Sequence, residues 1–348
     1  MTATAQEATV PGEHGLLGRA VDVHCHYVSR DLLGVDSRFG ARRDGAQGEA
    51  LYFGDRRLGP LPPGLTDLDL TVANMELTGL TERLCCTASW LTCYWAEPSL
   101  GQAITRAMNE SIARGVAAHP GRLMGLSSLP MQDVNLAVEE LHYATTRLGL
   151  VGVAIGTNVN GSYLDDPRFE PLLTAAEQLG VTIFLHPHQV AGAERLRNYG
   201  LSRAIGNPHE AATALSRVIL GGVLERHPQL RLCFPMGGGS IGVLLGRITH
   251  GWSVRPEARL KAPRAPAQYL RRCYFDTVVH SNASFELLLG ILSPSQLLLG
   301  SDWPWDMGLD QPRRLIEDSS LDEESRFAVL AGNVDRLLSR SDSLADEL

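Results

Sequence analysis

Short apolar runs alternate along this chain with amphipathic stretches. Most of the runs are continuous rather than alternating in polarity, as in parallel strands that are covered on both faces. The stretches between them carry apolar residues at helical spacing. The pattern predicts eight strands, at Ala20–His26, Arg83–Ala88, Leu123–Leu129, Leu150–Gly156, Thr182–His186, Leu230–Pro235, Cys273–Val279 and Leu297–Ser301. It predicts eight helices, at Asn74–Gly79, Gly101–His119, Asn135–Leu148, Phe169–Leu179, His209–His227, Ser240–His250, Ala283–Leu292 and Glu323–Leu338.

Eight consecutive strand–helix units predict an α/β fold of the closed (β/α)8 TIM-barrel type. The rival interpretation is an open, doubly wound parallel sheet. That fold commonly carries a glycine-rich fingerprint after its first strand, and no such fingerprint follows His26. The barrel is therefore the favoured architecture.

Two segments lie outside this regular pattern. Residues 1–18 are polar, with acidic positions and no apolar core, so we expect a disordered tail rather than a secretory signal. Residues 19–340 then form a single barrel domain. Residues 29–69, rich in Gly, Pro and Arg, are an insertion after the first strand. A long loop at that end of a barrel is typical of a lid or substrate-binding arm, and the alternative is a flexible surface loop.

Composition narrows the class of partner. Of the 348 residues, 44% are hydrophobic and 20% charged, which is ordinary for a globular protein. A net charge of -8 argues against nucleic acid or an anionic membrane as partner, and no apolar run is long enough to span a bilayer. The six cysteines form no CxxC pair and fall mostly in strand-like runs, which indicates reduced thiols of a cytoplasmic protein.

Histidine and carboxylate side chains follow three of the predicted strands. His24 and His26 are two residues apart, so they face the same side of the first strand. His186 ends the fifth strand, and Asp302 follows the eighth. Since the carboxyl ends of barrel strands meet at one rim, the sequence predicts one divalent metal there, most simply Zn²⁺, with Mn²⁺ or Cu²⁺ as alternatives. The fourth strand ends at Gly156–Thr157 without a carboxylate or lysine that could bridge a second ion.

Longer stretches carry a more specific resemblance. HxH on strand one, HP on strand five and GSDWP on strand eight resemble the second amidohydrolase family. SSLPMQD, GVAIGTNVNG, GGVLERHPQLRLCF and GRITHGWSVRP resemble its aminocarboxymuconate semialdehyde decarboxylase branch. The resemblance runs from about residue 20 to residue 335. It implies a metal-dependent carboxy-lyase that acts on a small carboxylic acid and works as a homodimer.

The same resemblance implies substrate-binding residues. Arg247, in the GRI stretch, matches an arginine that reaches the neighbouring subunit's site, and its alternative is an exposed arginine in an intramolecular pair. A second arginine comes from the insertion, where Arg57 is the first candidate and Arg56 nearly as good. His280 corresponds to a position near the site, or is a hydrogen-bonded structural histidine. The tryptophans near strand ends form either an aromatic wall for the substrate or ordinary core; they are Trp90, Trp95, Trp303 and Trp305.

One position departs from the family pattern. Met236 stands at the end of strand six, before the triple glycine, where the family has a histidine that is thought to act as a base. A thioether neither takes nor gives a proton. His188 also stands where relatives often carry Trp.

Three interpretations follow from this departure. In the first, the enzyme still decarboxylates and Asp302 delivers the proton to carbon. In the second, the chemistry has shifted toward hydrolysis or another reaction, with His188 or Cys25 as base or with Met236 favouring a softer metal. In the third, the chain is a non-catalytic homologue. The first defines the prediction: non-oxidative decarboxylation of a small aromatic or unsaturated, muconate semialdehyde-like acid.

Overall fold

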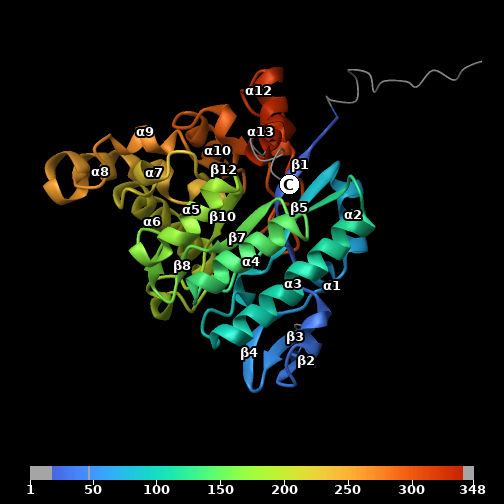
Figure 1. Ribbon diagram of the computed structural model, residues 1–348. Coiled ribbons are helices and arrows are strands. Elements are labelled where there is room, and N and C mark those ends of the chain that lie inside the picture. The colour runs from blue at the N-terminus through green and yellow to red at the C-terminus, as the bar shows by residue number, and fades with distance from the viewer. Residues whose placement is uncertain (1–17, 46–47, 340–348) are drawn as a thin grey trace, which may run out of the picture.

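Eight parallel strands form the centre of the molecule in a computed structural model, which describes residues 18–45 and 48–339 (Figure 1). They follow one another in the order β1, β5, β6, β7, β10, β11, β12, β13. The predicted barrel is therefore confirmed, while the predicted tail, apart from Gly18, lies outside the described residues. The strands are β1 Val21–Tyr27, β5 Glu82–Thr87, β6 Leu123–Ser127, β7 Gly152–Gly156, β10 Thr182–His186, β11 Arg231–Phe234, β12 Tyr274–Asp276 and β13 Leu297–Leu298.

Backbone hydrogen bonds close the barrel between its last and first strands. The Val23 N–H donates to the Leu299 carbonyl at 2.9 Å, and the Asp302 N–H donates to the His24 carbonyl at 2.8 Å. One residue further along, the His26 N–H donates to the Trp303 carbonyl at 2.8 Å. The chain beyond β13 thus continues the ladder alongside β1, and it carries Asp302 directly to the histidines.

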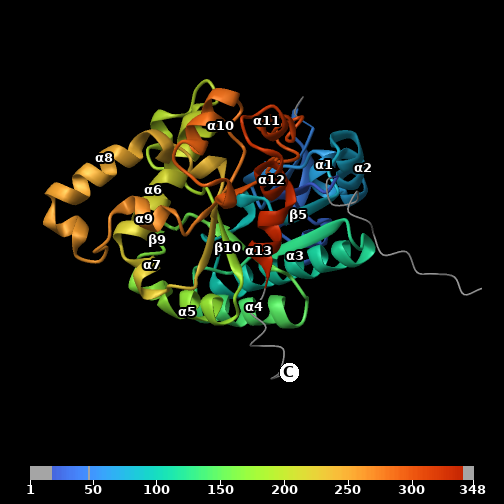
Figure 2. The ribbon, with the colours of Figure 1, turned by 90° about the horizontal axis from the view of Figure 1, so that it is seen from above.

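Helices surround the barrel, as Figures 1 and 2 show. Three predicted helices differ from the prediction. The stretch 74–79 is the carboxyl-terminal part of a longer helix, which begins at Leu68, inside the predicted insertion 29–69. The stretch 209–227 is divided, because Gly222 takes a left-handed φ of 73°, and the stretch 323–338 contains a π-helical turn at 328–332. The longer helices are α2 Leu68–Thr78, α3 Pro98–Ala118, α4 Val134–Thr146, α5 Glu170–Gln178, α6 Asn207–Leu220, α8 Ile241–Val254 and α10 Asn282–Leu289; shorter ones are α1 Pro63–Thr66, α7 Val223–Arg226, α9 Pro266–Leu270, α11 Arg314–Glu317, α12 Glu323–Phe327 and α13 Asn333–Leu338. Among the described residues, none of these helices has the length and apolar character needed to cross a bilayer.

Apolar side chains fill the barrel and close its amino-terminal end. One buried cluster takes members from seven barrel strands: Val21, Leu84, Leu126, Ala154, Phe184, Cys233 and Leu298. Val334 and Leu337 of α13 belong to the same cluster, and the Leu337 carbonyl accepts a hydrogen bond from Thr182 at the start of β10. This end is therefore plugged, which leaves the carboxyl ends of the strands for chemistry.

The insertion after β1 contains a small antiparallel sheet of β2 Phe39–Arg43, β3 Glu49–Phe53 and β4 Arg56–Pro60. Figure 1 shows this sheet outside the barrel, at the bottom of the view. It shares a buried cluster with Ile104 and Met108 of α3. Gly59 lies flat on Trp90, since an added Cβ there would come within 2.3 Å of the indole. The insertion is thus packed against a side chain near the strand ends, and its role as a lid stays a prediction.

Candidate metal centre

An irregularity in β1 includes the first candidate ligand, His24, and precedes the second, His26. The pairing of β1 with β5 shifts register between Asp22 and Cys25, as at a β-bulge. Below the shift, Asp22 bonds the buried Arg83 at 2.8 Å. Within it, the His24 ring lies 5.1 Å from the Phe184 ring of β10. The shift thus separates a structural ion pair from two histidines that face the mouth of the barrel.

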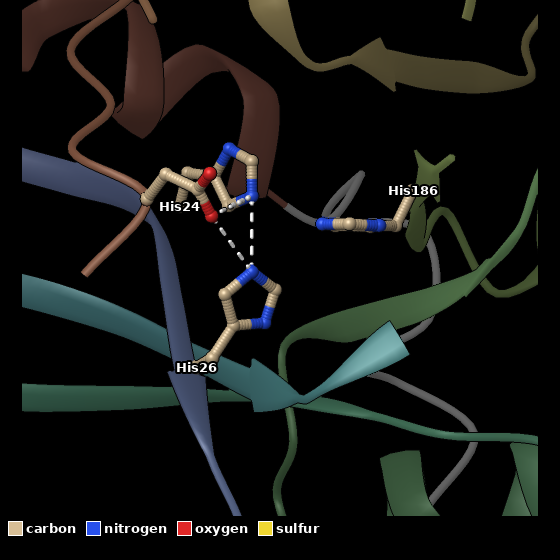
Figure 3. Close-up of side chains that lie close together, drawn as sticks. His24, His26 and His186 are labelled. Atoms are coloured by element: carbon tan, nitrogen blue, oxygen red, sulfur yellow. Dashed lines mark hydrogen bonds and ion pairs between the residues drawn. The ribbon is translucent and has the colours of Figure 1, made fainter. Parts of the chain in front are cut away.

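Four buried donors meet at this mouth. His24, His26, His186 and Asp302 each offer a ligand atom, and these atoms lie within 4.8 Å of one another. The Asp302 Oδ1 atom is 3.3 Å from His24 Nε2 and 3.1 Å from His26 Nε2. Figure 3 shows the three imidazole rings converging on one point from β1 and β10. The sequence prediction placed these four side chains together, and the structure brings them together.

Hydrogen bonds to the Nδ1 atoms of His24 and His186 orient the opposite ring nitrogens, Nε2, toward the cluster. His24 Nδ1 lies 2.6 Å from Asp276 Oδ2, and His186 Nδ1 lies 3.0 Å from the Pro187 carbonyl. Both acceptors take the Nδ1 proton, which leaves the lone pair of Nε2 directed at the cluster. His186 Nε2 is buried and has no hydrogen-bond partner. An orphaned buried nitrogen beside two imidazoles and a carboxylate is a donor set that fits a divalent metal.

The electrostatics of the cluster also favour a cation. Burial alone would lower the pKa of His24, but the Asp302 charge and the hydrogen bond to Asp276 raise that pKa to about 9. Burial works against the ionised form of Asp302 too, yet the neighbouring His24 and His26 hold its pKa at about 2. Burial lowers the pKa of His186 well below its usual range, so its lone pair is free. Asp276 and Asp302 therefore favour a positive charge in the cluster. His186 does not provide that charge by protonation, because its pKa is too low.

A cavity of about 320 Å³ opens above the donors, and its lining includes His186 and Asp302. This volume suits a small ligand. Met236, His280 and Asp302 line it and follow three neighbouring strands, β11, β12 and β13. All three have positive φ, at 56°, 62° and 61°. Backbone conformations of this kind are uncommon for such residues and concentrate at functional sites.

The other predicted site residues divide into two groups. Met236 and His280 line the cavity, together with Trp90 and Trp305. His188 does not belong to the lining; its ring packs on Tyr94 with centroids 5.3 Å apart, and burial lowers its pKa to about 4. Cys25 is buried between strands, with its Sγ 3.8 Å from Cys85 Sγ. Neither side chain faces the cavity as a base.

The remaining candidates lie away from the cavity in this chain. Trp303 packs on the Arg83 guanidinium, 5.6 Å from the ring centroid. Arg57 bonds Asp44 at 2.7 Å and Arg56 stacks over Trp95, so a contact with substrate would require the insertion to move. Arg247 lies midway along α8, a helix that Figure 2 shows at the edge of the molecule. Its side chain is exposed and does not line the cavity of its own chain.

Sequence reasoning missed two residues at the site. Asp276, which orients His24, interrupts an apolar strand with a charge, and that was the available signal. Arg203 lines the cavity from the loop after β10. Nothing in the sequence separates it from its neighbours Arg195 and Arg197.

Comparison with known proteins places these features in context. A family model described as amidohydrolase matches residues 21–340. A 2-amino-3-carboxymuconate-6-semialdehyde decarboxylase from Dictyostelium discoideum is 34% identical over 77% of this chain and 75% of its own length. The Caenorhabditis elegans protein of that name is 27% identical over 86% and 89%. Among solved structures, 5-carboxyvanillate decarboxylase LigW from Sphingomonas paucimobilis superposes with a TM-score of 0.79, at 25% identity over 93% of this chain and 99% of that one.

Proposed function

The chain belongs to the amidohydrolase family, in its aminocarboxymuconate semialdehyde decarboxylase-like branch, and from that premise we propose that it is a metal-dependent non-oxidative decarboxylase. Its substrate is a small aromatic or unsaturated, muconate semialdehyde-like carboxylic acid. The observation that carries the proposal is the buried set of His24, His26, His186 and Asp302 at the floor of a cavity of about 320 Å³. The relatives named above are decarboxylases, which supports the same reaction.

The reaction breaks one carbon–carbon bond, and a proton takes the place of the departing CO2, so nothing is oxidised. His24, His26, His186 and Asp302 would hold a divalent cation, which would act as a Lewis acid toward a substrate oxygen. Asp302 lines the cavity and its backbone is fixed by the hydrogen bond to the His24 carbonyl. We assign to its carboxylate, which the neighbouring histidines keep ionised, the relay of a proton from the substrate's hydroxyl or from water to the carbon that loses CO2. Asp276 keeps His24 in the required tautomer.

We propose Zn²⁺ as the native ion. Three imidazole nitrogens and one carboxylate oxygen suit zinc, although Mn²⁺ and Cu²⁺ bind donors of the same kind. Elemental analysis of protein purified without added metal tests this. About one zinc per chain supports it, whereas stoichiometric manganese or copper would replace zinc in the proposal. A metal content near zero that does not rise on reconstitution favours a non-catalytic homologue.

Met236 bears on the choice between decarboxylation and hydrolysis. Hydrolysis needs a base beside the attacking water. The Met236 thioether cannot serve, and neither His188 nor Cys25 lines the cavity. His280 does line it and is the base that a hydrolase of this kind would have to use. Decarboxylation requires only a proton donor near the substrate, which Asp302 provides.

We also propose that the working unit is a homodimer. The helix α8 is apolar along most of its length, yet Ile241 is its one buried residue. Val243 is 70% exposed on α8, and Leu260, just beyond it, is 80% exposed. A second copy would cover this surface and bring Arg247 to the neighbouring cavity, where its planar guanidinium suits a substrate carboxylate.

Mixing two inactive variants tests the shared site. Arg247→Ala and Asp302→Asn are purified separately and then mixed under conditions that exchange subunits. If Arg247 serves the partner's cavity, one of the two sites in each mixed dimer is intact, and the mixture regains about a quarter of wild-type activity. No regain, with dimers present by light scattering, places Arg247 outside the catalytic unit.

Carbon dioxide release from a panel of ortho-hydroxy and ortho-amino acids tests the reaction itself. We expect release by the metal-loaded protein, none after chelation, and none from Asp302→Asn. Cleavage of a C–O bond in an ester or a C–N bond in an amide, without CO2 release, would instead establish a hydrolase.

The six free, buried cysteines support our placing the enzyme in the reducing cytoplasm.

A further inference from the structure

One guanidinium faces the cavity from within this chain. Arg203 is the single arginine or lysine among the described residues that line the cavity. It lies on the π-helical turn Ser202–Gly206 (η7) that leads into α6. Its Nη1 atom bonds Oδ1 of Asp306 at 2.9 Å, and Asp306 follows β13. The pair therefore spans the cavity rim between segments that are 103 residues apart in sequence.

The backbone that carries Arg203 is packed firmly on both sides. A Cβ at Gly206 would come within 2.6 Å of Val190, and a Cβ at Gly239 would come within 1.8 Å of the Pro208 carbonyl. Glycine is thus required at 206, where the π-helical turn packs on Val190 of the preceding loop, and at 239, where the chain after β11 packs on the start of α6. The position of the Arg203 backbone is consequently tied to the strand end that carries Met236.

The ion pair itself is open to water. The Arg203 side chain is 53% exposed and that of Asp306 is 77% exposed. Surface ion pairs of this kind contribute little to stability, because solvent screens them and two long side chains must be held still. Such a pair can exchange its carboxylate for that of a ligand at small cost. Asp306 has no comparable alternative partner among the described residues of the cavity lining.

We propose that Arg203 is a specificity-determining residue that binds a second acidic group of the substrate. In this inference, which rests on the proposed function, the group that is lost as CO2 lies at the His186 and Asp302 end of the cavity. The second acid group displaces Asp306 and takes both N–H groups of the Arg203 fork. Asp306 holds the guanidinium at the rim until a dianionic ligand arrives, so the cavity selects diacids over monoacids.

A purely structural role makes the opposite prediction for one variant. If the ion pair is a latch that holds two loops together, removing either partner loosens the rim in the same way. If Arg203 binds substrate and Asp306 competes with it, then Arg203→Ala weakens diacid binding while Asp306→Asn leaves it unchanged or strengthens it. The sign of the Asp306→Asn effect therefore separates the two roles.

Calorimetry with two probes measures this on the metal-loaded protein. The probes are 2-hydroxybenzoate and 2-hydroxyisophthalate, which differ by one carboxylate. We expect wild type to bind the diacid about ten-fold or more tightly than the monoacid, as charge-assisted hydrogen bonds contribute on this scale. Arg203→Ala should abolish that preference and leave the monoacid affinity unchanged. Arg203→Lys should restore part of it, because an ammonium cannot bind bidentately.

Arg197→Ala is the matched control, since Arg197 is an exposed arginine of the same loop and does not line the cavity. Its affinities should equal those of wild type. The inference is overturned if Arg203→Ala keeps the diacid preference, if Asp306→Asn weakens binding of the diacid as Arg203→Ala does, or if neither probe binds. Its failure is distinct from that of the proposed function. CO2 release with no Arg203 effect removes only this inference, whereas an Arg203-dependent diacid preference without CO2 release removes only the reaction.

Discussion

Replacement of Asp276 by Asn should weaken metal binding through the tautomer of His24. The two side chains are fully buried, and His24 Nδ1 lies 2.6 Å from Asp276 Oδ2. The other carboxylate oxygen, Oδ1, accepts the Val278 N–H at 3.1 Å and the Gly237 N–H at 3.4 Å. An asparagine has one oxygen, and those two backbone donors will retain it. Its NH2 group will then face His24.

This arrangement puts two donors against each other unless the imidazole changes tautomer. If His24 Nδ1 becomes the acceptor, the proton moves to Nε2 and occupies the lone pair that the metal needs. Partners of metal-bound histidines typically contribute 10–100-fold to metal affinity. We therefore expect Asp276→Asn to raise the zinc dissociation constant by about 10–100-fold, or about 1.4–2.7 kcal/mol.

Competition with a fluorescent zinc chelator measures that constant. Asp306→Asn is the control, because it removes an exposed carboxylate from the same cavity and leaves the four donors untouched. Circular dichroism of the metal-free variants shows whether the fold is kept. A folded Asp276→Asn protein that binds zinc as tightly as wild type would refute the assignment of Asp276 as the residue that orients His24.

Three further predictions concern the cation, the family departure and the backbone. Zinc at about 100 times its dissociation constant should stabilise the protein by about 2.7 kcal/mol, seen as a rise in melting temperature that chelation reverses and that His186→Ala abolishes. Met236→His places an imidazole in the cavity wall, at a positive φ that histidine tolerates better than most residues. If the departure at Met236 only removed a base, this variant releases CO2 faster; no gain counts against that view and favours a pocket in which Asp302 acts without such a base. Gly239→Ala must accommodate a φ of 65° and a Cβ 1.8 Å from the Pro208 carbonyl, so we expect a loss of more than about 1–3 kcal/mol in urea unfolding. Gly34→Ala, where an added Cβ meets nothing within 4 Å and φ is not positive, is its control and should leave the unfolding midpoint unchanged or slightly raised.

The strands and metal donors were predictable because both depend on local rules. A buried parallel strand is a continuous apolar run, and the residue that follows it lies at the same rim as those of its neighbours. Reading where apolar runs end was therefore enough to bring His24, His186 and Asp302 together. The irregularity in β1 was not needed for this, since two histidines at spacing two share a face wherever the strand begins.

Other features depend on contacts that no local rule contains. Asp276 acts on His24 from 252 residues away, and its role depends on the packing of β12 against the barrel interior. The small sheet of the insertion was missed because its strands are short and rich in arginine. The break between α6 and α7 did have a local signal, the pair Gly221–Gly222, whose second member ends the helix in a left-handed conformation.

The backbone at the ends of β11, β12 and β13 connects the departure at Met236 to the choice of reaction. Met236, His280 and Asp302 hold positive φ at three neighbouring strand ends, which directs all three side chains to one cavity. A different side chain at position 236 changes the chemistry of the cavity without changing its shape, because the surrounding structure holds the backbone in its strained conformation. With a thioether at Met236, His280 is the one histidine of the described cavity lining, apart from the metal donor His186, that could activate water, while Asp302 still relays a proton to carbon. The same backbone that would serve a hydrolase therefore serves here a reaction that needs a proton donor and no activated water.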